Sequence, residues 1–179
     1  MKEIPMLFNT VMVRASLEGR KTQTRRLTRE TFVRENPIAQ GYFENEAGAL
    51  VKAPARVGDL IYVREKWTTF QNGYIYRADL HTDDGRLWPN PLPPNPDMVL
   101  WRPSLHMPKK AARIWLEVTG VRAEPLQHIT VCDAAAEGCS RMREFPRVWD
   151  DCYGGTPYSW QRNPFVWVID FRPVVHHGA

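Results

Sequence analysis

Basic side chains are concentrated in one short part of the sequence, between Asn9 and Glu30. Six cations there face only two acids, Glu18 and Glu30. The cations are Arg14, Arg20, Lys21, Arg25, Arg26 and Arg29. Such a cluster can neutralise the phosphates of a nucleic acid, although most charge runs form a solvated face. The net charge of +4 permits a nucleic-acid partner without requiring one.

A second group of chemically interesting side chains lies between Trp101 and His106. Ser104 and His106 are two residues apart and would share a face in an extended segment, but no acidic residue nearby would orient the histidine. We therefore expect this pair to position a substrate or to fix the surrounding loop. Trp101 and Arg102 can stack on a base or hold a phosphate. Anchoring of the loop to the core by Trp101 is an equal alternative.

The cysteines and the remaining histidines show no spacing typical of a metal site. They are Cys132, Cys139, Cys152, His81, His128, His176 and His177. We expect no metal and no cofactor, and we expect the thiols to stay reduced. No apolar run approaches the 18 residues of a membrane span, and the N-terminus has no apolar core of a secretory signal. The sequence therefore predicts a cytoplasmic protein without a membrane partner.

The basic segment is expected to begin where a first helix ends. Residues 8–18 place their apolar side chains close to the helical repeat, with Asn9 or Thr10 as the cap. Gly19 follows where a C-terminal glycine belongs. Residues 22–28 then have the pattern of a polar strand.

Strands are also expected at residues 60–67, 112–122 and 165–171. The last of these is almost continuously apolar, which is typical of a strand buried on both faces, so we expect it to be central. Asn72 and Gly73 indicate a hairpin turn.

Two short helices are expected near the C-terminus. Thr130 and Asp133 resemble a capping box that opens a helix over residues 131–137. A second helical pattern spans residues 145–152, with Pro146 as a point where it can break.

The chain has the length of one domain. Residues 88–108 contain seven prolines, which exclude a helix or a central strand there. We expect one α+β domain over residues 1–173 with an insertion at 69–108, and a flexible tail at 174–179. The order of elements favours a small β-barrel decorated with short helices.

Residues 19–26, GRKTQTRR, resemble the GxKxxTxR signature of ASCH domains, a branch of the PUA-like superfamily. Three further pieces follow in the order of that family. They are VGDL at 57–60, EVTGV at 117–121 and WVIDF at 167–171. The blocks VREKW at 63–67 and WRPSLHMP at 101–108 are similar to a prophage-associated subgroup. The resemblance covers residues 7–171.

The resemblance implies a PUA-like β-barrel with a cleft, lined by residues 21–26, for RNA or a modified nucleoside. Some small ASCH proteins are amidohydrolases that remove the acetyl group of N4-acetylcytidine with a lysine, a threonine and a glutamate. Lys21, Thr24 and Glu137 match these three. The substrate- or RNA-binding positions would be Arg20, Thr22, Arg25, Arg26, Trp101, Arg102, Ser104 and His106.

Amide hydrolysis places demands on Lys21 and Thr24. A threonine hydroxyl needs a neighbour that takes its proton. A lysine can do so only if burial or adjacent cations lower its pKa, and neighbouring arginines act in that direction. On a regular strand, side chains three residues apart point to opposite faces. The catalytic interpretation therefore requires Lys21 to lie in the turn before the strand.

Two other functions fit the same segment. One is a non-catalytic module that grips RNA with Arg20, Lys21, Arg25 and Arg26. The other is a metal-independent ribonuclease of phage origin. The insertion at 69–108 departs from the compact deacetylases of the family and can shape the cleft for a larger ligand. A monomer is the favoured state.

Overall fold

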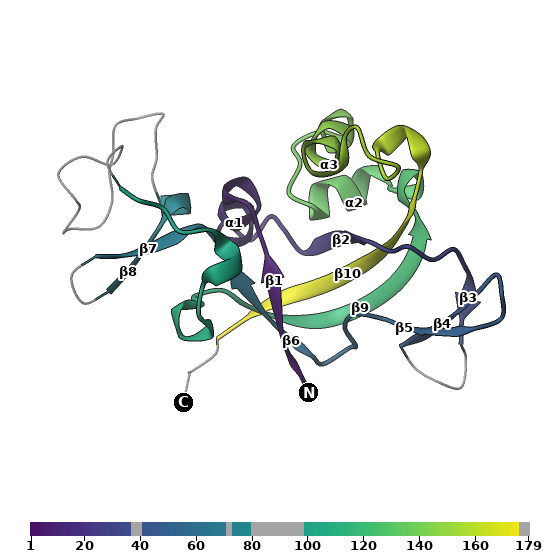
Figure 1. Ribbon diagram of the computed structural model, residues 1–179, viewed down its shortest axis with the longest axis horizontal. Coiled ribbons are helices and arrows are strands. Elements are labelled where there is room, and N and C mark those ends of the chain that lie inside the picture. Colours follow the sequence, from purple (N-terminus) through teal and green to yellow (C-terminus); the bar gives the residue numbers. More distant parts are fainter. Residues whose placement is uncertain (37–40, 71–72, 80–98, 176–179) are drawn as a thin grey trace.

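The computed structural model describes residues 1–36, 41–70, 73–79 and 99–175 (Figure 1). Its main element is a five-stranded sheet with the order β1-β6-β9-β10-β2. The strands are β1 (Glu3–Leu7), β2 (Gln23–Leu27), β6 (Leu60–Arg64), β9 (Trp115–Pro125) and β10 (Phe165–Val174). β1 pairs with β6 in parallel and the other pairs are antiparallel. The α+β class is confirmed.

β10 lies between β9 and β2, so the prediction of a central closing strand is confirmed. Its apolar run is explained by burial on both faces. Val166 and Val168 pack into the cluster beneath the C-terminal helices, whereas Ile169 packs into the core beside the first helix. Trp167 contacts Phe32 and Phe43 of a neighbouring small sheet.

The first helix, α1 (Thr10–Leu17), is capped as expected. The side chain of Asn9 accepts a hydrogen bond from the Met12 amide. Gly19 has a φ of 72°, a conformation that suits glycine and ends the helix. The amides of Arg20 and Lys21 then both donate to the Ala15 carbonyl, which reverses the chain toward β2.

The C-terminal helices are α2 (Val131–Ala136) and α3 (Phe145–Tyr153), which lie over the β2–β10 part of the sheet (Figure 1). Thr130 and Asp133 form the predicted capping box. Pro146 lies in the first turn of α3. Backbone N–H groups have no acceptor within the helix at that position, so a proline there costs no hydrogen bond. Pro146 therefore does not break the helix.

Two smaller sheets flank the main one. β3 (Phe32–Glu35), β4 (Tyr42–Asn45) and β5 (Leu50–Lys52) form an antiparallel meander. β7 (Trp67–Phe70) and β8 (Gly73–Tyr76) form the hairpin predicted at Asn72–Gly73, although residues 71–72 lie outside the described part.

The main sheet is open, so the expected closed barrel is not found. β1 and β2 are its two edges, and no ladder joins them within the described residues. Pro5 in β1 has no N–H to offer a further strand. A side chain spans the opening instead, because Arg26 of β2 donates to the Leu7 carbonyl at the end of β1, 3.0 Å away.

The insertion expected at 69–108 contributes β8 and short 3₁₀ turns, and its residues 80–98 lie outside the described part. Val174, assigned to a flexible tail, still pairs with Trp115 in the sheet, which corrects the start of that tail. Residues 176–179 are not among the described ones. In the parts of the chain that the structure describes, no helix has the length and apolar character needed to cross a membrane.

Candidate functional site

Lys21 is a buried ammonium at the junction of α1 and β2. Only 2% of the residue is exposed. Its Nζ donates to Oε2 of Glu137 at 2.5 Å, to the Gln23 carbonyl at 2.7 Å and to the Glu137 carbonyl at 3.0 Å. β2 begins at Gln23, so Lys21 lies in the turn before the strand, as the catalytic interpretation requires.

The ends of α1 and α2 bring Lys21 and Glu137 together across 116 residues of sequence. The Thr22 amide donates to the carbonyl of Ala136, the last residue of α2. Gly138 follows with a φ of 94°, and a Cβ added there would lie 2.8 Å from the Cβ of Ala15. The two helix ends therefore touch through a position where only glycine fits.

Burial sets the electrostatics of this pair. It lowers the pKa of Lys21 below the usual lysine value, Glu137 acts against that shift, and Arg26 adds to it. The C-terminal end of α2 also favours a cation. Arg20 was expected to contribute, but it is exposed, pairs with Glu18 and donates to the Gly138 carbonyl.

Thr24 is completely buried, and its hydroxyl faces Arg26. Nη1 of Arg26 donates to Oγ1 of Thr24 at 3.0 Å. The Arg26 guanidinium lies 5.6 Å from the centre of the Phe8 ring, and Nζ of Lys21 lies 5.5 Å from the same centre. Phe8 therefore contributes its π face to two cations at once. Phe8 is therefore a further member of the site, and it was not among the predicted site residues.

Arg25 points away from Thr24, into an ion-pair network beneath α2. Its guanidinium contacts Oε1 of Gln23 at 2.5 Å and Oε1 of Glu124 at 2.8 Å. Oε1 of Glu137 lies 3.5 Å from Nη1 of Arg25 and has no hydrogen-bond partner in the described structure. Lys21 and Arg25 are thus buried and paired, which corrects the expectation that they contact RNA phosphates.

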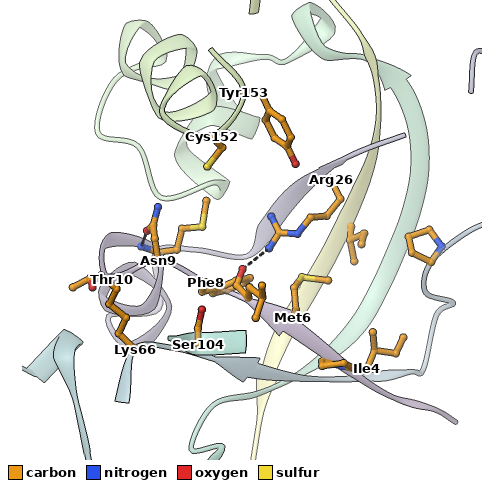
Figure 2. Close-up of a pocket in the computed structure, with 15 residues that line it drawn as sticks. Ile4, Met6, Phe8, Asn9, Thr10, Arg26, Lys66, Ser104, Cys152 and Tyr153 are labelled. Atoms are coloured by element: carbon orange, nitrogen blue, oxygen red, sulfur yellow. Dashed lines mark hydrogen bonds between the residues drawn. The ribbon is translucent and has the colours of Figure 1, made fainter. Parts of the chain in front are cut away.

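An apolar cleft of about 730 Å³ opens over Arg26, between the two edges of the main sheet (Figure 2). Residues from Ile4 to Phe8 line it along β1, and Arg26 reaches it from β2. Cys152 and Tyr153 at the end of α3 border the opposite side. Figure 2 shows the Tyr153 hydroxyl directed toward Arg26.

A smaller cavity of about 130 Å³ lies beside Glu137. It shares Asn9 and Met12 with the larger cleft, so the two spaces adjoin at the start of α1. Cys139 and Val148 also line it. This places Glu137 next to a space large enough for a small acyl group.

The segment from Trp101 to His106 is positioned mainly by contacts with the β7–β8 hairpin. Arg102 lies over the Trp67 ring and forms a bridge with that residue. Trp101 lies 5.9 Å from the Arg77 guanidinium. These contacts support the anchoring alternative for Trp101.

Ser104 and His106 do not share a face. They belong to a 3₁₀ turn, Ser104–His106, in which positions two apart point in different directions. Ser104 lines the cleft, whereas His106 is exposed. Thr22 is also exposed, directly before β2. Of the predicted site residues, Arg26 and Ser104 line the cleft and Glu137 lines the smaller cavity. Lys21 and Thr24 are buried beside them and line neither space.

Tyr153 and Lys66 also line the cleft, and neither was among the predicted site residues. Tyr153 follows Trp149 by one helical turn, and this spacing was the available signal for a shared helix face. Among the described residues, no group of three or more His, Cys, Asp or Glu side chains could hold a metal ion. Comparison with family models, with curated proteins and with solved structures gives no match.

Proposed function

We propose that the chain is a cytoplasmic ASCH-type domain of the PUA-like class that binds a modified nucleoside in the cleft and hydrolyses an amide on its base. A volume of about 730 Å³ is in the range of small-molecule sites. The lining is mainly apolar, with Arg26, Lys66 and Tyr153 as polar groups that can orient a base.

The contact between Thr24 and Arg26 carries this proposal. The Thr24 hydroxyl is the nucleophile, and the guanidinium 3.0 Å from it both lines the cleft and can stabilise the oxyanion formed on the substrate carbonyl. Arg26 covers Thr24 in this structure, so the guanidinium moves toward the substrate oxygen when the ligand enters. Arg26 is thereby a catalytic residue rather than a phosphate contact.

Lys21 and Glu137 supply the proton path. The ammonium of Lys21 first transfers a proton to Oε2 of Glu137, 2.5 Å away. The neutral amine then turns from the Gln23 carbonyl, its acceptor in the resting site, to take the proton of the Thr24 hydroxyl. Oγ1 attacks the amide carbon, the C–N bond breaks, and the departing amine takes a proton from Glu137. Water then cleaves the acyl–threonine ester. The net reaction converts an amide and water to an amine and a carboxylic acid.

The alternatives of RNA gripping or RNA cleavage by residues 19–26 receive less support. Arg25 and Lys21 have ion-pair partners in the interior, and Arg20 is paired with Glu18. Three of the four charges that would hold an RNA backbone at this segment are therefore already compensated.

Release of cytidine from N4-acetylcytidine tests the proposed function. Thr24→Val keeps the shape of the side chain and removes the nucleophile, so we expect turnover to fall by a factor of about 100 or more. Thr22→Val is the matched control, because Thr22 is exposed two residues away, and it should turn over at the wild-type rate. Thr24→Ser should retain activity.

Equal turnover by Thr24→Val and Thr22→Val would exclude Thr24 as the nucleophile. A wild-type protein that binds N4-acetylcytidine in an Arg26-dependent manner without releasing cytidine would instead identify a nucleoside-binding module.

A further inference from the structure

A further cavity, of about 210 Å³ and separate from the two spaces at the candidate site, lies where β1 begins and β5 ends. Three basic residues line it, Lys2, Lys52 and Arg56. All three are exposed, and Lys2 lies far in the sequence from Lys52 and Arg56, which are four residues apart. We call this space the basic cavity.

The positive charge of the basic cavity is poorly compensated. Asp59 is the single acidic residue among the described residues that line it. Its carboxylate is occupied by the backbone, with Oδ1 accepting from the Lys2 amide at 2.7 Å and Oδ2 from the Arg56 amide at 3.1 Å. The Arg56 guanidinium lies over the Tyr42 ring, 5.2 Å from its centre, so an aromatic face supports this cation.

Lys2 and Lys52 lie close enough to repel each other. The contact with the Lys2 side chain is the main cause of a lowered pKa at Lys52, which is fully exposed. Both lysines line the basic cavity, so a ligand with negative charge bound there would offset their repulsion.

The basic cavity is connected to the cleft. Pro54 lines both spaces, and β1 lies between Lys2, which precedes it at the basic cavity, and Phe8, which follows it in the cleft. An extended strand rises about 3.3 Å per residue, so Lys2 and Leu7 are roughly 16 Å apart. A ligand that extends along β1 can reach both.

We propose that the basic cavity binds a backbone phosphate of single-stranded RNA, one base of which occupies the cleft. Lys and Arg side chains bind nucleic-acid phosphates, and single strands offer unstacked bases for insertion into pockets. The proposal rests on the proposed function for the identity of the ligand in the cleft. It makes the substrate a modified nucleotide within a strand rather than a free nucleoside.

Fluorescence anisotropy with a labelled single-stranded oligoribonucleotide tests the site. Lys52→Glu reverses one exposed charge in the basic cavity, and we expect it to weaken binding by about fivefold or more and to reduce the slope of log affinity against log salt by about 1. Lys110→Glu makes the same change at an exposed lysine on the turn Lys109–Ala111 and should bind as the wild type does.

Equal affinity and equal salt slope for Lys52→Glu and Lys110→Glu would overturn the proposal. So would displacement of the oligonucleotide by inorganic phosphate at an equal concentration of phosphate groups, because the site would then hold a free anion only. These outcomes are independent of cytidine release. Loss of turnover in Thr24→Val together with equal binding by the two lysine variants would preserve the proposed function and reject the phosphate site.

Discussion

Lys21 has an acceptor for each of its three N–H bonds, so the resting site holds it as an ammonium ion. Burial nevertheless disfavours that charge, and Arg26 opposes it as well. The result is a lysine that is charged in the resting structure but gives up its proton more readily than one in water. Glu137, in contact with Nζ, is the group that receives it.

The pH dependence of turnover follows from this lowered pKa. The active form holds one proton in the Lys21–Glu137 pair, as the resting ion pair does, so the rate should fall as the pH rises through the pKa of Lys21, which lies below the usual lysine value of 10.5. Arg26→Gln removes a cation that lowers this pKa, so the fall should move to higher pH, whereas Arg26→Lys keeps a positive charge and should move it less. The measurement is kcat as a function of pH for the three proteins. A fall at the same pH in all three would contradict the electrostatic role of Arg26.

The motif in the sequence identified Lys21, Thr24 and Glu137, and the structure places the first and last in contact. The motif did not assign different roles to Arg25 and Arg26. Consecutive strand residues point to opposite faces, so Arg26 shares the face of Thr24 and Arg25 faces the acids beneath α2. Which face of β2 is buried, and which carboxylates pair with its basic residues, depends on Glu124 and Glu137. These two residues lie about 100 positions further along the chain.

At the scale of elements, the site depends on two helix ends that meet. α1 ends at Gly19 and sends the chain into Lys21, and α2 ends beside Glu137. Gly138 lets them approach, because its missing side chain leaves room for Ala15. The distance between Lys21 and Glu137 is therefore set by backbone packing rather than by the two side chains alone.

Gly138→Ala tests this packing. The new methyl would lie 2.8 Å from the Cβ of Ala15, so the helix ends must separate and turnover should fall together with the thermal midpoint. Gly155→Ala is the control, because Gly155 also has a positive φ, of 73°, but nothing lies within 4 Å of the added Cβ. Both variants carry the backbone cost of about 1–2 kcal/mol for alanine in that conformation. Equal stability and activity of the two would show that the contact does not position the site.

The elements with strong local signals were predicted from the sequence. α1, α2 and β2 have caps or alternation that short-range rules detect, and β10 has a long apolar run. β1 was missed because its five residues include Pro5 and form a strand only by pairing with β6, more than 50 residues away. The same holds for the three short strands of the β3–β5 meander, whose partners and neighbours decide their conformation.

The main sheet of the molecule is curved and open (Figure 1). Residues of its two edge strands, β1 and β2, line the cleft. The prediction of a closed barrel missed this opening. Whether the two edge strands of a sheet meet depends on the tilt and stagger of all five strands together. Arg26 bridges the edges through Leu7, so one side chain links the architecture to the proposed chemistry. The basic cavity lies next to the cleft, because Pro54 lines both spaces.

The most direct test of the central claim is mass spectrometry of the acid-quenched protein during turnover of N4-acetylcytidine. The account predicts one acetyl group on the peptide that contains Thr24, present in the wild type and in Thr22→Val and absent from Thr24→Val. An active wild-type protein without this label, together with undiminished turnover by Thr24→Val, would contradict it.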